Sequence, residues 1–282
     1  MKCLRPVIVE KKLYRCGKCY WCRVNQRSLW TMRLQHEITQ HKAALFCTLT
    51  YNEDNLPSYH GKGILVKDHL QRFFKRLRKD VKELRYFACG EYGERSGRPH
   101  YHAVVFGYDE ALFADAIRNA WRDGFTQVVP VSEVSQLGYV AGYVSKKLLS
   151  NAENAELPAE FHVSSHGIGS AWLRENAYNL VYDMMLSRDL KPLPRYYIEQ
   201  LEKLYPDEIC GFRLRRERES DLRLCDKVLE IAPEFGGRLW SELNAVEQRE
   251  ARDRLAEAAY KDFTFLMNER RERSYHETAS VT

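Results

Sequence analysis

Apolar positions along the chain repeat with two different periods, and each period predicts its own kind of element. Residues 45–51 form a short, mostly apolar run that predicts a buried strand, and the polar segment 52–57 predicts a loop after it. Further on, apolar residues recur at helical spacing and predict an amphipathic helix. They are Leu70, Phe73, Phe74, Leu77, Val81 and Leu84.

The middle of the chain alternates between strand-like and helix-like segments. Strands are predicted at 84–89 and 100–106, joined by a glycine-rich turn, and a third at 125–131. Helices are predicted at 111–121 and 134–149. Strands joined by a short turn pair in antiparallel fashion, whereas the other connections are helical, so the expected class is α+β.

The last third of the chain is rich in charge and predicts helices. A polar stretch at 150–154 is typical of a linker, and the region from about residue 205 is charge-dense. Residues 245–273 predict one long helix, with Asn244 as its cap and Glu247 three residues later. Pairs four residues apart, Glu250–Arg254 and Glu269–Arg273, favour it further. This region offers no catalytic constellation, and we expect a scaffold or a partner-binding segment.

Length and composition exclude several classes of protein. The 282 residues are 44% hydrophobic and 29% charged, which argues against wholesale disorder and fits one large domain or two small ones. The longest apolar runs are far too short for a membrane span, and the N-terminus has no secretory signal. We therefore expect an intracellular protein without membrane contact. A net charge of +5 favours a polyanionic partner only weakly.

Basic residues are concentrated on two of the predicted helices. The helix that begins near residue 24, where Trp30, Leu34 and Ile38 recur every four residues, is expected to carry basic side chains on its outward side. These are Arg23, Arg27 and Arg33. Residues 67–85 hold eight basic and three acidic side chains. They form either a solvated helix face or a phosphate-binding one, and the candidates for phosphate contact are Arg72, Lys75, Arg76 and Lys79.

Half of the eight cysteines lie within the first 22 residues: Cys3, Cys16, Cys19 and Cys22. Without a secretory signal a disulfide framework is not expected. Four thiolates suffice for a tetrahedral zinc site. An iron–sulfur cluster is the rival, because Cys-x-x-Cys-x-x-Cys also begins a ferredoxin motif, although its Cys-x3-Cys-Pro completion is absent. Four free cysteines in a basic arm are the third reading.

Two histidines in one predicted strand are candidates for metal binding. Side chains alternate along a strand, so His100 and His102 share a face. Glu91 lies where an antiparallel partner strand brings it beside the pair, although Glu94, Glu53 and Asp54 are competitors. Two imidazoles and a carboxylate suit Mn²⁺, Fe²⁺ or Zn²⁺, or Mg²⁺ together with phosphate oxygens.

The predicted helix at 134–149 has an apolar face and an opposite face that carries Tyr139, Tyr143, Lys146 and Lys147. A phenol ionises near pH 10, far below a serine hydroxyl, and is therefore easier to activate as a nucleophile. Lys146 lies about one turn beyond Tyr143, where it favours the phenolate or offsets charge on a phosphate. Ordinary packing is the alternative role for these tyrosines.

With these residues, the sequence resembles the HUH endonucleases, and within them the replication initiators of small single-stranded DNA phages, Microviridae of the gokushovirus-like group. The resemblance extends over about residues 3–197 and rests on motifs in a fixed order. They are Cys16-Gly17-Lys18-Cys19-Tyr20-Trp21-Cys22-Arg23, Cys47-Thr48-Leu49-Thr50-Tyr51, Gly90-Glu91-Tyr92-Gly93 with Gly97-Arg98-Pro99-His100-Tyr101-His102, the segment from Gly138 to Lys147, Gly167-Ile168-Gly169 and Leu193-Pro194-Arg195-Tyr196-Tyr197.

The resemblance implies an HUH-type central antiparallel sheet of about five strands flanked by helices. It implies a Cys-rich segment with the first helix (1–42), a nuclease core (43–150), an extension packed on the core (151–204) and a charged helical region (205–282). His100, His102 and Glu91 would bind Mg²⁺ or Mn²⁺. Tyr139 and Tyr143 would be nucleophiles, with Lys146 as an auxiliary and Lys147 as a DNA contact. A structural zinc would occupy the N-terminal cysteines.

The implied activity is the start of rolling-circle replication, by nicking and joining one strand at a single-stranded DNA origin through a 5′-phosphotyrosine. Its partners would include host replication proteins in the bacterial cytoplasm. Tyr143, nearest Lys146 in sequence, is expected to attack first. Three alternatives stay open: a non-haem iron or cupin-type enzyme, a non-catalytic cysteine–metal DNA-binding protein, and a transposase or relaxase of the same superfamily with one tyrosine.

Overall fold

The computed structural model describes residues 3–93, 96–107, 110–131, 137–138, 141–142, 157–186, 192–235 and 237–279. The chain divides into two compact units, one formed by Met1–Val24 with Tyr205–Thr282 and the other by Asn25–Leu204. No helix in these described ranges is long and apolar enough to cross a membrane. The linker predicted at 150–154 lies outside the described residues, as do the side chains of Glu269 and Arg273.

The larger unit is built around a five-stranded sheet in the order β8-β3-β7-β6-β9. Its strands are β3 (Ala43–Tyr51), β6 (Arg85–Tyr92), β7 (Pro99–Gly107), β8 (Gly124–Pro130) and β9 (Phe161–Ser164), and every pairing is antiparallel. The expected α+β class and the sheet of about five strands are therefore confirmed. Strand β7 lies at the centre, between β3 and β6.

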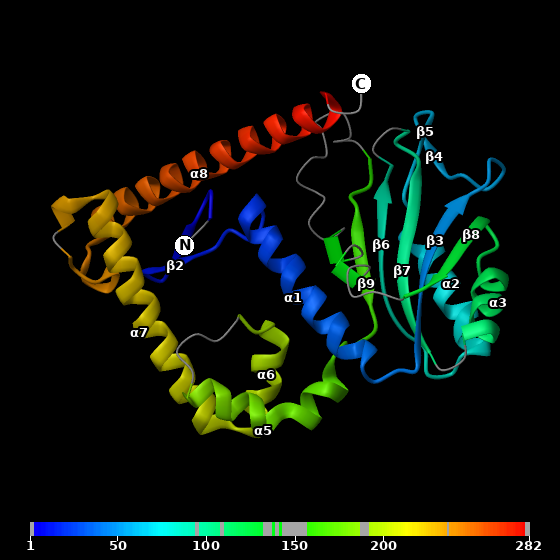
Figure 1. Cartoon of the computed structure of the whole chain (residues 1–282), viewed down its shortest axis with the longest axis horizontal. Coiled ribbons are helices and arrows are strands. Elements are labelled where there is room, and N and C mark those ends of the chain that lie inside the picture. The colour runs from blue at the N-terminus through cyan, green and yellow to red at the C-terminus, as the bar shows by residue number, and fades with distance from the viewer. Residues whose placement is uncertain are drawn as a thin grey trace. The chain divides into compact units, whose positions relative to one another are not determined.

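Helices α2 (Lys67–Asp80) and α3 (Glu110–Ala120) cover one face of this sheet (Figure 1). The buried side of α2 is the apolar stripe that its spacing predicts, because residues three and four apart lie on one helix face. Alternate residues of β3 and β7 face it. This core includes Leu70, Phe73, Phe74 and Leu77 from α2, and Leu45, Leu49, Tyr101, Ala103 and Val105 from the strands.

Helix α1 (Tyr20–Ile38) packs on the opposite face of the sheet. Leu34 from α1 meets Val104 and Phe106 from β7, which alternate with the residues facing α2. Leu137 and Ala141, two described residues of the predicted tyrosine helix, are fully buried in the same cluster. The sheet therefore separates a scaffold face covered by α2 and α3 from a second face shared by α1 and the segment around residues 137–142.

Several expected boundaries differ from the structure. α1 begins at Tyr20, so Cys22 already lies in its first turn. β6 continues to Tyr92, which places Glu91 inside the strand rather than after it. α2 ends at Asp80 because the next residue, Val81, has an extended backbone with φ −122° and ψ 94°. The ends of elements depend on pairing partners and caps, which apolar spacing does not encode.

The outward placement expected for Arg33 is wrong. Its guanidinium lies over the rings of Trp30 and Tyr196, and its Nε donates a hydrogen bond of 3.0 Å to the carbonyl of Ile168. A planar, weakly hydrated guanidinium can be buried this way by stacking and hydrogen bonding. Helical spacing alone does not reveal such a contact, since Ile168 is 135 residues away in sequence.

A buried ion pair fixes α1 to β6 and to the Gly167–Gly169 loop. Arg85 donates to both carboxylate oxygens of Glu37, at 2.6 and 3.1 Å, and the backbone N–H of Gly169 donates to the same carboxylate at 2.6 Å. Burial raises the pKa of Glu37, but hydrogen bonds from His41, Arg85 and Gly169 outweigh it and lower the pKa to about 2. After this loop come α5 (Ser170–Leu186) and α6 (Arg195–Leu204).

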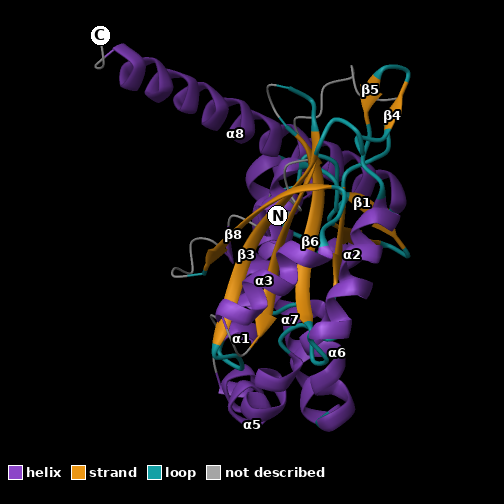
Figure 2. Ribbon diagram, turned by 90° about the vertical axis from the view of Figure 1, so that its right-hand side faces the viewer, coloured by secondary structure: helices purple, strands orange, loops and turns teal. Residues whose placement is uncertain are grey.

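A short hairpin, β4 (Ser58–Tyr59) with β5 (Lys62–Gly63), lies at the end of the sheet where β3 and β6 finish and β7 begins (Figure 2). An added Cβ at Gly63 would lie 2.8 Å from the ring of Pro99. Glycine therefore allows the close approach of this hairpin to the start of β7.

The smaller unit combines a hairpin, β1 (Val7–Val9) and β2 (Lys12–Tyr14), with helices α7 (Pro206–Ile231) and α8 (Ala245–Ala279). Two 3₁₀ turns, Pro233–Phe235 and Trp240–Glu242, connect the helices. The capping role expected for Asn244 is confirmed. Its side chain accepts from the backbone N–H of Glu247 at 3.1 Å, and Glu247 accepts from the N–H of Asn244 at 2.8 Å. Glu250 and Arg254 also pair, at 3.0 Å.

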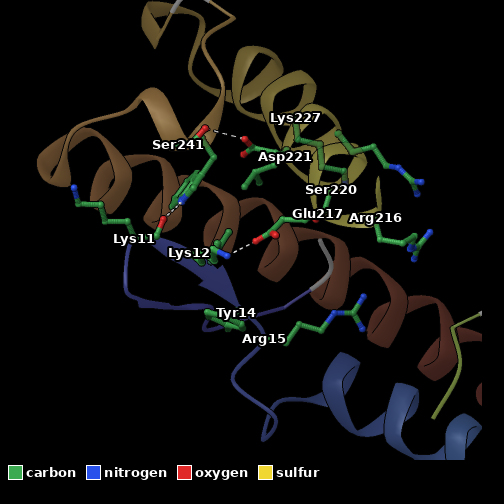
Figure 3. Close-up of a pocket in the computed structure, with 14 residues that line it drawn as sticks. Lys11, Lys12, Tyr14, Arg15, Arg216, Glu217, Ser220, Asp221, Lys227 and Ser241 are labelled. Atoms are coloured by element: carbon green, nitrogen blue, oxygen red, sulfur yellow. Dashed lines mark hydrogen bonds and ion pairs between the residues drawn. The ribbon is translucent and has the colours of Figure 1, made fainter. Parts of the chain in front are cut away.

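The β1–β2 hairpin and α7 enclose a cleft of about 740 Å³ within this unit (Figure 3). Its lining contains six basic and two acidic side chains, and one of the acidic ones, Glu217, forms an ion pair with Lys12. Trp240 lies in the wall, and its indole N–H donates to the carbonyl of Lys11 at 3.1 Å. The cleft thus has a predominantly positive lining.

Candidate metal centre

Sheet register brings two histidines and a glutamate together on one face. In the β6–β7 pairing Glu91 lies opposite His100, and in the β3–β7 pairing Thr48 lies opposite His102. The two histidines have the same parity along β7 as Val104 and Phe106, so they lie on the face covered by α1. The antiparallel pairing predicted from the short turn is what places Glu91 beside them.

One carboxylate oxygen of Glu91 contacts both imidazoles. Glu91 Oε1 lies 2.7 Å from His100 Nε2 and 3.2 Å from His102 Nε2. The side chains of Glu91 and His102 are 7% and 9% exposed, and that of His100 is 19% exposed, which leaves the site open on the His100 side.

The second nitrogen of each histidine is held by a neighbouring group. His100 Nδ1 donates to the carbonyl of Arg98 at 3.1 Å, and His102 Nδ1 lies 3.1 Å from the hydroxyl of Thr48. The ring of Phe46 stacks on His102, with centroids 5.5 Å apart. Because a carbonyl can only accept, a neutral His100 carries its proton on Nδ1 and presents a lone pair at Nε2.

This arrangement fits a divalent cation. With His100 in that tautomer, two acceptor atoms lie 2.7 Å apart, and a shared proton or cation is needed to offset their repulsion. Ligands about 2.1 Å from an octahedral ion and at right angles to one another lie about 3 Å apart, close to the spacing here. Imidazole and carboxylate together suit Mn²⁺ and related ions, and the outer contacts at Nδ1 are typical of metal-binding histidines.

The competing acidic residues are not in this group. Glu53 pairs with Arg98 at 2.7 Å, and its side chain is 82% exposed. Asp54 is exposed, and Glu94 lies outside the described residues. Across the described part of the chain, Glu91, His100 and His102 form one of two groups of side chains that converge as metal ligands do, and the four N-terminal cysteines form the other.

The predicted nucleophiles Tyr139 and Tyr143, with Lys146 and Lys147, lie outside the described residues, but neighbours of theirs are described. The carbonyl of Gly138 accepts from Arg27 Nε at 3.1 Å, which ties the segment to α1. Leu137 and Ala141 pack with Phe46, whose ring also contacts His102. The segment that contains the tyrosines therefore shares one hydrophobic cluster with the metal face.

The basic candidates on α2 belong to the opposite side of the sheet. Arg72 pairs with Asp68, and Arg76 donates to the carbonyl of Ala120 at 2.6 Å. Lys75 and Lys79 are exposed. A role of these four residues in DNA binding stays a prediction, but α2 packs on the scaffold face and not on the face that carries His100 and His102.

Sequence reasoning missed the groups that support the two histidines. Tyr101, between them in sequence, points to the scaffold face, where its hydroxyl lies 2.7 Å from that of Tyr51 and donates to the carbonyl of Val66 at 3.0 Å. Burial raises the pKa of both Tyr51 and Tyr101, so these phenols stay protonated. The motif Thr48-Leu49-Thr50-Tyr51 contained the signal, since alternate residues of that strand support opposite faces of β7.

Comparison with known proteins supplies the missing context. The sequence model of the replication-associated protein ORF2 family matches residues 44–148, which include the metal ligands and both predicted nucleophiles. The replication-associated protein VP4 of Bdellovibrio phage phiMH2K is 26% identical over 219 residues, 69% of this chain and 69% of that protein. The chain is a relative of the phage replication-associated proteins.

Two further relatives belong to the same group. Replication-associated protein ORF2 of Spiroplasma virus 4 is 28% identical over 73% of this chain and 72% of its own length. Replication-associated protein ORF4 of Chlamydia phage 1 is 25% identical over 68% of this chain and 54% of its own length. These phage replication-associated proteins bear out the resemblance to phage replication initiators that the motifs indicated.

Proposed function

We propose that the chain is a replication initiator of the HUH type, which nicks and rejoins one strand of single-stranded DNA at an origin. The observation that carries the proposal is the contact of Glu91 with both His100 and His102 on the sheet face shared with Leu137 and Ala141. The relationship to phage replication-associated proteins supports it independently.

The metal site would hold the scissile phosphate. His100, His102 and Glu91 would bind Mn²⁺ or Mg²⁺, and the bound ion would polarise a phosphate oxygen as a Lewis acid. The contacts of both Nδ1 atoms orient the two imidazoles toward Glu91, so the protein supplies the geometry before DNA arrives. The 19% exposure of His100 leaves an approach for the phosphate from that side.

The chemical step proposed for Tyr143 is a phosphoryl transfer. The phenol oxygen attacks the phosphorus and the P–O3′ bond breaks. The leaving 3′ oxygen takes up a proton, and the phenolic proton passes to solvent or to a nearby base. The products are a 5′-phosphate joined to tyrosine and a free 3′-hydroxyl for a polymerase. Lys146 would lower the pKa of the attacking phenol or neutralise charge on the phosphate.

A second tyrosine allows a second transfer without release of the first strand. Tyr139 would attack the junction regenerated after one round of synthesis, while the free 3′-hydroxyl attacks the first phosphotyrosine and restores the phenol. Leu137 and Ala141, buried against the metal face, alternate in sequence with these tyrosines. A single-tyrosine transposase or relaxase would have no use for the pair.

The test uses the full chain with labelled single-stranded oligonucleotides that tile the genome encoding it. Incubation with Mn²⁺ should yield one nicked site on a denaturing gel and a covalent protein–DNA adduct. His100→Ala should abolish both, whereas His60→Ala, at an exposed position of the β4–β5 turn, should leave both unchanged. Salt-dependent binding without cleavage would favour the non-catalytic DNA-binding reading instead.

A further inference from the structure

The four N-terminal cysteines converge in the smaller unit, away from the nuclease residues in sequence. Their sulfur atoms all lie within 4.8 Å of one another. The separations are 4.0 Å for Cys16–Cys22, 3.8 Å for Cys19–Cys3 and 3.7 Å for Cys22–Cys3. A disulfide bond holds its two sulfurs about 2.0 Å apart, so these contacts are between separate thiols.

These distances match the edges of a metal tetrahedron. Zinc binds thiolate sulfur at about 2.3 Å, and the corners of a regular tetrahedron of that radius lie about 3.8 Å apart. A four-iron cluster would spread the four sulfurs further, because each would bind a different iron. We propose that Cys3, Cys16, Cys19 and Cys22 hold one structural zinc ion.

Backbone N–H groups are directed at the sulfurs. Cys16 Sγ accepts from the N–H groups of Lys18 and Cys19, at 3.5 and 3.3 Å, and Cys3 Sγ accepts from the N–H of Cys16 at 3.3 Å. Cys19 Sγ accepts from the N–H of Leu4 at 3.4 Å. A neutral thiol is a weak acceptor, whereas a metal-bound thiolate carries the negative charge that such donors stabilise.

The local chain is built to present these ligands. Gly17 has a φ of +73°, which turns the backbone between Cys16 and Cys19 so that both sulfurs point the same way. Cys22 follows in the first turn of α1, and Cys3 comes back to the group across the β1–β2 hairpin. Arg15, Lys18 and Arg23 flank the motif and offset the net negative charge that zinc with four thiolates carries.

The zinc would tether a hairpin too small to be stable alone. β1 and β2 have three residues each, and an isolated two-stranded hairpin is marginal at best in water. Cys3 precedes the hairpin and Cys16 follows it, so one ion closes both of its ends. The hairpin also packs Ile8 and Leu13 against the core of this unit and forms one wall of the basic cleft in Figure 3. Metal binding would therefore be coupled to folding of this wall.

The test measures metal in the purified full chain. We expect about one zinc per chain by elemental analysis, still present in a His100→Ala background and released by a thiol-specific mercurial into a zinc-sensitive dye. Cys19→Ser should lose it and lower the melting temperature. Cys210→Ser, an exposed cysteine of the same unit outside the group, should keep it. Stoichiometric iron with a coloured absorption spectrum, or zinc retained by Cys19→Ser, would overturn the proposal.

A second measurement covers the case in which Cys19→Ser does not fold. Wild-type protein grown with cobalt should show the intense charge-transfer and ligand-field bands of tetrahedral cobalt bound to four thiolates, and these should disappear on addition of zinc. Weak octahedral cobalt bands alone would show that the thiols bind no metal. Neither result depends on cleavage of DNA, so the zinc proposal and the nuclease proposal can fail separately.

Discussion

The hydroxyl of Thr48 lies 3.1 Å from Nδ1 of His102, on the strand directly opposite. This contact orients the imidazole so that Nε2 points to Glu91. It makes Thr48 a positioning residue for the metal site, although it touches neither DNA nor metal in the proposed reaction. Outer contacts of this kind commonly contribute about 10–100-fold to metal affinity.

Thr48→Val should therefore weaken Mn²⁺ binding by about tenfold while the chain stays folded. The matched control is Thr50→Val, because Thr50 lies opposite His100 in the same strand pair but its hydroxyl bonds weakly to the carbonyl of Phe125 at 3.5 Å. Isothermal titration with Mn²⁺ measures both. Equal affinities for the two variants would remove Thr48 from the site.

Removal of single tyrosines should separate the two transfers. If Tyr143 attacks first, Tyr143→Phe should lower the rate of covalent adduct formation by at least about 100-fold. Tyr139→Phe should form the first adduct normally and fail to complete joining. Adduct formation by Tyr143→Phe at the wild-type rate would reverse the assignment, and cleavage by the double variant would exclude both tyrosines.

The Glu37–Arg85 pair predicts a specific pH dependence of stability. The pKa of Glu37 is about 2 in the folded chain, below its ordinary 4.5, so the unfolded chain binds more protons between these values. The contribution, about 3 kcal/mol to the free energy of unfolding, is complete above about pH 4.5 and is lost as the pH falls toward 2.

Glu37→Gln should consequently be less stable than the wild type at pH 7, by an amount that shrinks as the pH falls below 4.5. Urea unfolding across this range measures the difference. Glu175→Gln is a suitable control, because this carboxylate accepts a hydrogen bond from Gln40 at an exposed position. A stability difference that does not vary with pH would show that the carboxylate charge contributes nothing.

Gly169→Ala should be strongly destabilising. Gly169 has a φ of +80°, and an added Cβ would lie 2.1 Å from the hydroxyl of Tyr197. Gly61 has a similar φ of +74° but open space around it, so Gly61→Ala isolates the backbone cost of about 1 kcal/mol. Gly169→Ala should exceed that value by at least about 1–3 kcal/mol. Thermal unfolding would reveal equal losses if Tyr197 simply moves aside.

Local periodicity was enough to predict the strands and the helices that form the sheet and its scaffold face. The apolar stripe of α2 and the pair His100 and His102 are each written within a few residues, and the short turn before them specified the antiparallel partner carrying Glu91. The placement of these three side chains required no long-range information. Alternation along two paired strands was sufficient.

The rest depends on contacts between distant segments. Nothing near Arg33 in sequence indicates that it stacks on Tyr196, and nothing near Glu37 indicates Arg85, 48 residues away. Strands of two or three residues, as in β1–β2 and β4–β5, are too short to show a period. The two hairpins were missed for that reason, although Cys3 and Cys16 already marked the ends of one.

Tyr101 stands between the two histidines in sequence, yet it belongs to the other side of the sheet, where it contacts Tyr51 and Val66. A single strand therefore carries the ligands and their anchor. If every residue of β7 were varied under selection for phage growth, position 101 should tolerate substitution as poorly as positions 100 and 102. The cause would differ, because loss at the histidines removes a ligand, whereas loss at Tyr101 changes the spacing of ligands that are still present.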